Sequence, residues 1–393
     1  MPTWITATPP ETSFIVEIQL LIIISLTIAA TFIVVVVSAG LVIHKALNSH
    51  ALRKKKRLYS IYSDLVAEIL LQELPPLPPQ AKTSAIFEQY EEMIAPLKSK
   101  IAQLSGAKKL LEKEILRQAL IDFAIDVAGE VSDRLVYFFY SFGFVEEEIA
   151  LLSHRHWWIR AQAARDAGLL KARRAITALT AALEDEHHDV RIQAMESLVR
   201  LVGVDALRTI FRVSKNLSQW TCVELSTIVM EYSESAVPYL IEGLEATDQS
   251  VILFCIEMLA EIGFVTAVEP LRRMAQDYPN IIVRAKAIEA LGRLGDERAE
   301  ALLSAYLENP SPLIRLQSMR ALSKIGAPKV IPKLVKRVLQ GDLPEKIIAA
   351  RAIAASGEEG IQVLQTFVTE EDSTYAAVAG QILEELDVAQ ELS

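Results

Sequence analysis

The feature that most constrains the fold is a short pattern that recurs from residue 156 to the C-terminus. Its clearest copies share an arginine at one fixed position, and these arginines are Arg160, Arg191, Arg284 and Arg315. Neighbouring copies lie about 31 residues apart, and two degenerate copies, with Thr221 and Ile252 in the arginine position, fill the gap in the middle. A fixed period of this length is typical of stacked supersecondary units, so it predicts a solenoid.

Each copy is expected to form two antiparallel α-helices. In the copy that starts near Asn280, apolar residues recur at helical spacing and form one stripe along a first helix. Gly295 follows where this helix has to end, and Asp296 stands where it can cap a second helix. The residues of the stripe are Val283, Ala287, Ile288, Leu291 and Leu294.

One copy carries a recognisable motif, Asp189-Val190-Arg191-Ile192-Gln193-Ala194-Met195-Glu196-Ser197-Leu198. Together with the glycine and the leucine-rich second helix that follow, it resembles the short HEAT repeats common in bacterial proteins. The resemblance implies an α-solenoid of about seven or eight units over residues 154–393. Some HEAT-like chains resemble phycobilin lyases, but no residue pattern here marks a bilin site.

A long apolar segment precedes the array. No charged residue stands between Ile18 and Ile43, and about 26 residues of helix are longer than the ~30 Å hydrocarbon core of a bilayer. A signal peptide needs a basic flank and a shorter apolar stretch, whereas Met1 to Glu17 contains no Lys or Arg. We therefore predict an uncleaved transmembrane helix over residues 15–44, with residues 1–14 on the extracytoplasmic side.

A basic cluster follows the apolar segment and predicts its orientation. Positive charge stays on the cytoplasmic side, so the solenoid is expected in the cytoplasm, held by a single pass at the plasma (inner) membrane. The cluster can also rest on anionic headgroups, at about 1 kcal/mol per basic residue. It consists of Arg53, Lys54, Lys55, Lys56 and Arg57.

Two further regions separate the anchor from the array. Residues 45–82 are predicted to form a basic juxtamembrane helix and a stiff linker, because Pro75-Pro76-Leu77-Pro78-Pro79 favours an extended chain. Residues 83–153 are predicted to form a helical region that caps the array, split or kinked at Pro96 and interrupted at Gly129.

Candidate binding residues fall into three groups. The four repeat arginines are expected to be structural, bonded to the turns between repeats and to acids such as Asp166 and Asp189. Trp157 and Trp158 are candidate partner contacts, with one ring packed inward and the other exposed. The second helices are expected to line the concave surface and to make it basic; their candidate residues are Arg173, Arg174, Arg208, Arg212, Lys215, Arg272, Arg273, Lys329, Lys333, Lys336 and Arg337.

Several functional classes find no support in the sequence. It contains no GxSxG, Walker A, GxGxxG or HExxH motif, so we expect no catalytic residues, no cofactor and no enzyme activity. His156 and His187 lie one repeat apart but lack a recognisable ligand set, and Cys222 and Cys255 form no CxxC, so no metal site is expected. The formal net charge of −10 argues against nucleic acid as a partner.

These features together predict a membrane-tethered cytoplasmic scaffold that binds protein partners, themselves associated with the membrane. Its array would present an extended face, and its anchor would keep that face near the bilayer. The alternative is a regulator or sensor that binds an anionic small molecule or a lipid headgroup on the concave face.

Overall fold

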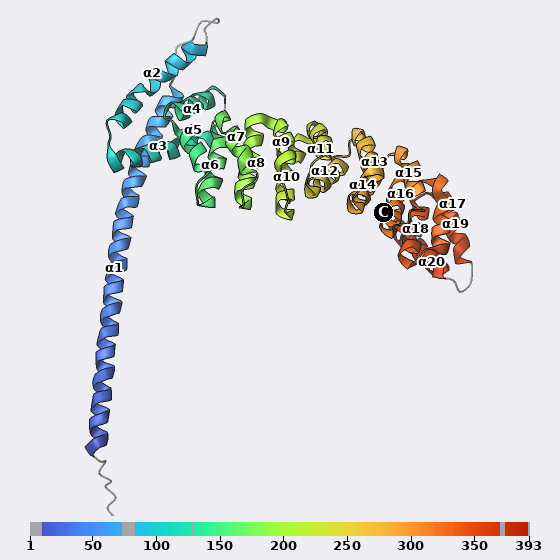
Figure 1. The fold of residues 1–393 in the computed structure, drawn as a ribbon, viewed down its shortest axis with the longest axis horizontal. Helices are drawn as coiled ribbons and strands as arrows, with labels where there is room; N and C mark the ends of the chain where they lie inside the picture. Colours follow the sequence, from blue (N-terminus) through green and yellow to red (C-terminus); the bar gives the residue numbers. More distant parts are fainter. Residues whose placement is uncertain (1–9, 73–82, 128, 370–373, 392–393) are drawn as a thin grey trace, which may run out of the picture. The chain divides into compact units, whose positions relative to one another are not determined.

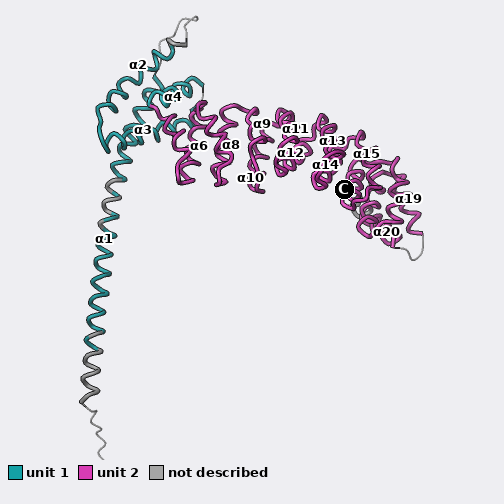
Figure 2. The backbone as a smooth tube through the Cα atoms, in the orientation of Figure 1, with its two compact units in different colours: residues 1–142 teal, residues 143–393 magenta. Residues whose placement is uncertain are grey.

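The computed structural model describes residues 10–72, 83–127, 129–369 and 374–391, and every regular element in these ranges is a helix (Figure 1). The all-α fold is therefore confirmed. The chain divides into two compact units, Met1–Phe142 and Gly143–Ser393 (Figure 2). Residues 1–9 and 73–82 lie outside the described residues, and the second range contains the predicted proline-rich linker at 75–79.

Unit 1 begins with one continuous helix, α1 (Pro10–Leu71), which contains both the predicted membrane segment and the predicted juxtamembrane helix. Its part Ile23–Val42 has a mean hydropathy of 2.4 over 20 residues, and none of it is buried in the protein. Its length and composition are enough to cross a membrane, and a signal sequence shares both properties. This part of α1 does not belong to the core of unit 1, because a core segment would be buried.

The C-terminal part of α1 forms the core of unit 1 with α2 (Thr83–Ala102), α3 (Gly106–Asp126) and α4 (Gly129–Ser141). The hydroxyl of Tyr62 donates a hydrogen bond to Glu112 at 2.5 Å. Burial raises the pKa of Tyr62, and this hydrogen bond raises it further. The hydrogen bond to Asp122 raises the pKa of Tyr59 to about 12. Both tyrosines fasten α1 to α3.

Arg134 on α4 donates hydrogen bonds to carbonyl oxygens at the C-terminal end of α1. Its Nη1 donates to the carbonyl oxygens of Leu70 at 3.1 Å and Gln72 at 2.7 Å, which a helix end leaves without intrahelical partners. Helix α2 runs through Pro96 without a break, so of the two predicted outcomes, a kink or a split, the split is excluded. The predicted interruption at Gly129 is confirmed, since α3 ends before it and α4 begins at it.

Unit 2 opens with α5 (Phe144–Leu151), which packs on the first repeat helix, and continues as a series of helix pairs. The first helices are α6 (Trp157–Leu169), α8 (His188–Val202), α10 (Gln219–Tyr232), α12 (Gln249–Ile262), α14 (Ile281–Leu294), α16 (Pro312–Ile325), α18 (Leu343–Ala354) and α20 (Thr374–Glu391). The second helices are α7 (Ile176–Ala182), α9 (Ala206–Val213), α11 (Val237–Gly243), α13 (Val268–Asp277), α15 (Glu300–Tyr306), α17 (Ile331–Gln340) and α19 (Glu358–Val368).

Short 3₁₀ turns lead into most of the second helices. They are η1 (Arg173–Ala175), η2 (Gly203–Asp205), η3 (Ser233–Ala236), η4 (Val265–Ala267), η5 (Glu297–Ala299) and η6 (Pro328–Val330). The glycine that ends a first helix takes a left-handed conformation, as Gly263 and Gly295 do, and Asp296 then caps the following turn. The punctuation predicted for the copy near Asn280 is confirmed.

The first helices of unit 2 form one layer and the second helices another (Figure 1). Except around α10, first helices pack on one another more extensively than second helices do, as α6 on α8 and α14 on α16 show. Small residues permit this: a Cβ on Gly168 would lie 2.4 Å from Ser197 Oγ, and one on Gly292 would lie 2.5 Å from Ala321 Cα. In a curved stack the more closely packed layer is the inner one, so this packing favours the first helices as the concave face, where the second helices were expected.

Candidate functional site

The repeat arginines hold the turns that precede the first helices. In three copies, Nη1 of Arg160, Arg191 or Arg315 donates to the carbonyl oxygens six and five residues earlier. These bonds fix the turn against the helix that starts after it. The six acceptors are His154 at 2.9 Å, Arg155 at 3.3 Å, Asp185 at 2.8 Å, Glu186 at 3.1 Å, Asn309 at 2.9 Å and Pro310 at 3.0 Å.

Two of these arginines also reach into the next repeat. Arg160 donates to both carboxylate oxygens of Asp185, at 2.7 and 2.8 Å, and Arg315 Nε donates to Glu345 at 2.7 Å. Burial opposes the charge of Asp185, but the hydrogen bonds from Arg160 and from the His187 amide outweigh burial and keep the pKa of that carboxyl below its usual value. The inter-repeat acids are therefore Asp185 and Glu345, not Asp166 and Asp189.

The arginine position is filled differently in the other copies. Arg284 Nε donates to the Ala275 carbonyl at 3.0 Å and its guanidinium lies over the Tyr306 ring. Lys346 stands one repeat after Arg315, and its Nζ donates to the Val338 and Leu339 carbonyls at 3.0 and 3.1 Å. Lysine at this position was missed because the pattern was defined by arginine. All these cations are engaged within the array.

Most basic residues of the second-helix layer are neutralised by acids. Arg208 on α9 binds Glu242 on α11 at 2.7 Å, and Lys215 binds Glu184 at 2.7 Å, so both pairs join consecutive repeats. The carboxylate partners raise the pKa of Arg208 and of Lys215. Further pairs are Arg174 with Glu146, Arg272 and Arg273 with Glu269, and Lys336 and Arg337 with Glu308. Arg173 in η1 and Arg212 in α9 are exposed.

Trp157 and Trp158 are both exposed, by 38% and 51%, so the expectation that one packs inward is wrong. Each stacks on an imidazole: Trp157 on His187 with 3.7 Å between ring centroids, and Trp158 on His156 with 4.3 Å. Ligand atoms of His187, His188 and Asp189 lie within 4.8 Å of one another, so these three consecutive residues form a group that was not recognised from the sequence as a possible ligand set. His187 Nδ1 already accepts the Asp189 amide at the start of α8.

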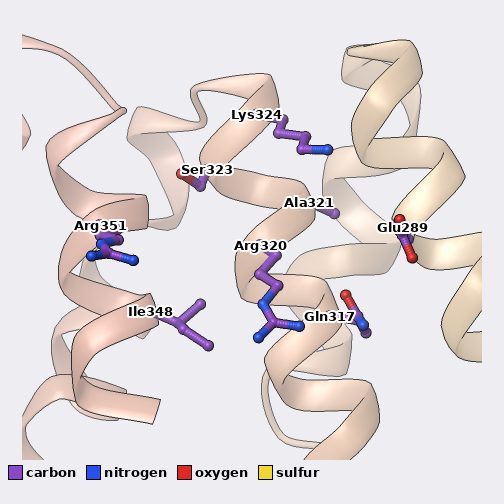
Figure 3. Close-up of a pocket in the computed structure, with 8 residues that line it drawn as sticks. All are labelled: Glu289, Gln317, Arg320, Ala321, Ser323, Lys324, Ile348 and Arg351. Carbon is purple, nitrogen blue, oxygen red and sulfur yellow. The ribbon is translucent and has the colours of Figure 1, made fainter. Parts of the chain in front are cut away.

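A groove of about 400 Å³ opens in the first-helix layer between α14, α16 and α18 (Figure 3). The side chains of α16 occupy its centre, with Arg351 of α18 on one side and Glu289 of α14 on the other. The lining residues are Glu289, Gln317, Arg320, Ala321, Ser323, Lys324, Ile348 and Arg351.

The groove carries cations that the array does not use. Arg320 and Lys324 stand one turn apart on α16 and are exposed, and neither has an ion-pair partner among the described residues. Arg351 binds Glu385 at 3.1 Å, and Glu289 binds Lys286 at 3.3 Å, so these charges are already balanced. A guanidinium beside an ammonium and the Gln317 amide matches a carboxylate or a phosphate.

Arg320 was missed because the inner surface was expected on the second helices. The repeat does contain a pattern that could have indicated Arg320. In most copies the residue five places after the arginine position is charged, and none of these charged residues is buried. That residue is basic at the two ends of the row and acidic between them. The row consists of Arg165, Glu196, Glu257, Glu289, Arg320 and Arg351.

The comparison with protein families matches residues 146–216, 237–303 and 278–355 to the model of HEAT repeats. These stretches of unit 2 are similar to HEAT repeats. The resemblance seen in the motif around Arg191 is thereby supported, and unit 2 is a solenoid of HEAT-like helix pairs.

Known proteins add a few similarities. An uncharacterized phycocyanin operon protein Z of Pseudanabaena tenuis is 28% identical over 155 residues, which are 37% of this chain and 75% of that protein. The complex of CpcE and CpcF of the phycocyanin lyase of Nostoc is 23% identical, covers 61% of this chain and 87% of that chain, and gives a TM-score of 0.27. An engineered protein of known structure is 19% identical to this chain. The match covers 83% of this chain and 98% of the engineered protein, with a TM-score of 0.34.

Proposed function

We propose that this protein is a membrane-tethered HEAT-repeat scaffold that binds a segment of another protein along its first-helix layer. An acidic side chain of that segment enters the groove around Arg320. The observation that carries this proposal is the contrast between the two layers. Seven of the eleven candidate cations of the second-helix layer pair with acids of the array, whereas Arg320 and Lys324, which stand together in one groove, have no ion-pair partner among the described residues.

The tether rests on α1. Its apolar part Ile23–Val42 has 20 residues, about 30 Å of helix, which matches the hydrocarbon core of a bilayer. The basic cluster at 53–57 is exposed, as a cytoplasmic flank at a membrane surface would be. The solenoid then works on the cytoplasmic face of the inner membrane, where anchoring raises its concentration near membrane partners.

The groove is tested with the full chain in phosphatidylcholine nanodiscs and a fluorescent glutamate-rich peptide as the probe. We expect Arg320→Ala to weaken peptide binding about tenfold or more, because a charge-assisted bond contributes about 1.5–3 kcal/mol. The matched control is Arg273→Ala, which removes an equally exposed cation of the second-helix layer that Glu269 already pairs. Equal weakening by both variants would show a general charge effect and reject the groove.

The same groove supports a second candidate, a site for an anionic small molecule or lipid headgroup. Its volume of about 400 Å³ falls in the usual range of small-molecule pockets, about 300–1,000 Å³. Inorganic phosphate and phosphatidylserine nanodiscs separate the two. If phosphate or phosphatidylserine occupies the groove and the glutamate-rich peptide does not, the small-molecule or lipid function holds and the scaffold function fails.

A further inference from the structure

The outward face of α10 carries large apolar side chains that the array does not need. Trp220 is 59% exposed, Val223 53% and Met230 44%, and their spacing puts them on one face of the helix. The residues that hold α10 in the solenoid are on the opposite face, where Leu225 and Val229 are buried. Folding therefore gains little from the exposed three, and an exposed tryptophan in such a group is typical of a protein contact.

Helix α10 also differs from its neighbours within the first-helix layer. It packs on α8 and α12 less extensively than α6 packs on α8 or α14 on α16, so its outer face is more open than theirs. It lies between the stretches 146–216 and 237–303 that match the HEAT model. Thr221 stands in the arginine position, and its amide bonds to Ser218 Oγ at 3.1 Å. We call Trp220, Val223 and Met230 the α10 stripe.

Acidic residues border the stripe on α10 itself. Glu224 and Glu231 are seven residues apart, which places them on one side of the stripe, and neither has an ion-pair partner among the described residues. On the neighbouring helix α12, Glu257 and Glu261 are already bound to Arg293. On α10 and α12 the free charge beside the stripe is therefore negative.

We propose that the α10 stripe docks an amphipathic helix of a partner protein that carries lysine or arginine along one edge of its apolar side. The apolar side covers Trp220, Val223 and Met230, and the basic edge faces Glu224 and Glu231. This rests on the proposed scaffold function and names a second contact of the same layer. A second copy of this chain would bring the same acidic edge, and an anionic membrane surface would be repelled by it.

The test uses the full chain in phosphatidylcholine nanodiscs and two labelled peptides. Both place leucine at helical i, i+3, i+4 and i+7 spacing; one has lysine and the other glutamate at the remaining positions. Anisotropy should show that the leucine–lysine peptide binds at least about tenfold more tightly than the leucine–glutamate peptide. We expect Trp220→Ser, and Glu224→Gln combined with Glu231→Gln, each to weaken it about tenfold.

The matched control is Trp158→Ser, which removes a tryptophan that is 51% exposed, against 59% for Trp220, from another first helix. Equal effects of the two serine variants, or equal binding of the two peptides, would overturn the proposal. So would quenching of Trp220 fluorescence by brominated phosphatidylserine in the nanodisc, which would mean that the stripe enters the membrane. Far-UV circular dichroism checks that each variant is folded.

This outcome can be told apart from that of the groove. Arg320→Ala should leave binding of the leucine–lysine peptide unchanged, and Trp220→Ser should leave binding of the glutamate-rich peptide unchanged. Loss of only one kind of binding then identifies which of the two sites is wrong.

Discussion

The bridge between Arg160 and Asp185 should be the strongest single tie between the first two repeats. Arg160→Ala removes two hydrogen bonds to the Asp185 carboxylate and two to turn carbonyls. The side chains of the pair are only 10% and 12% exposed, so the nearly buried Asp185 carboxylate would lose its cationic partner and keep the His187 amide as a donor. We expect a loss of about 3 kcal/mol, the lower end for breaking a buried ion pair.

Arg191→Ala is the comparison variant, because Arg191 bonds to the carbonyls of Asp185 and Glu186 in the equivalent turn. Loss of those bonds should lower the free energy of unfolding by about 1–3 kcal/mol, less than Arg160→Ala does. Urea unfolding followed by tryptophan fluorescence reports on this region, since Trp157 stacks on His187 beside the turn.

The lowered pKa of Asp185 predicts how the stability loss caused by Arg160→Ala changes with pH. The folded pKa of Asp185 lies below its unfolded value, so its stabilisation is present above the unfolded pKa, about 3.9, and is lost as the pH falls through the folded pKa. The difference in free energy of unfolding between wild type and Arg160→Ala should therefore be largest at pH 7. It should shrink when the pH falls below the pKa of the unfolded Asp185 carboxyl. A penalty no larger than that of Arg191→Ala, or one that grows as the pH falls, would refute the reasoning.

Three more predictions concern packing, unit 1 and topology. Gly168→Ala should lower the free energy of unfolding by about 1–3 kcal/mol in urea unfolding, because its Cβ would meet Ser197. Gly380→Ala, with open space around it, should stabilise α20 by about 0.5–1 kcal/mol in the same assay. Tyr62→Phe should lower the stability of unit 1 by about 1–3 kcal/mol by leaving buried Glu112 without its donor, measured by hydrogen exchange in α1 and α3. A C-terminal alkaline phosphatase fusion should be inactive in cells, and an active one would reverse the proposed orientation.

The repeat period predicted the fold well because burial of one apolar face per helix dictates which positions must recur. Arg160 and Arg315 bond to turns, as the fixed position suggested, but their acid partners could not be found from sequence spacing. Asp185 and Glu345 come close only when two repeats stack, and that stacking distance is set by small residues such as Gly168. Lys346 bonds to turn carbonyls because of its position in the repeat, and a search for arginine alone does not find it.

The binding surfaces were harder to predict, for two physical reasons. Which layer faces inward depends on how closely successive helices pack, so Arg320 was assigned no role while the paired Arg208 was favoured. Exposure of an apolar residue depends on which neighbours reach it. Trp157 and Trp158 are both exposed because each stacks on a histidine at the surface, and Trp220 is exposed because α10 stands less closely against its neighbours.

The central claim is that partners bind to the first-helix layer. It is tested most directly with a photo-crosslinking amino acid placed at Gln317, in the groove, and at Lys329 in η6, in native membranes at equal expression. We predict that Gln317 crosslinks to a protein partner, that Lys329 does not, and that Arg320→Ala abolishes the crosslink. A crosslink from Lys329 that is as strong as that from Gln317 and survives Arg320→Ala would contradict the claim.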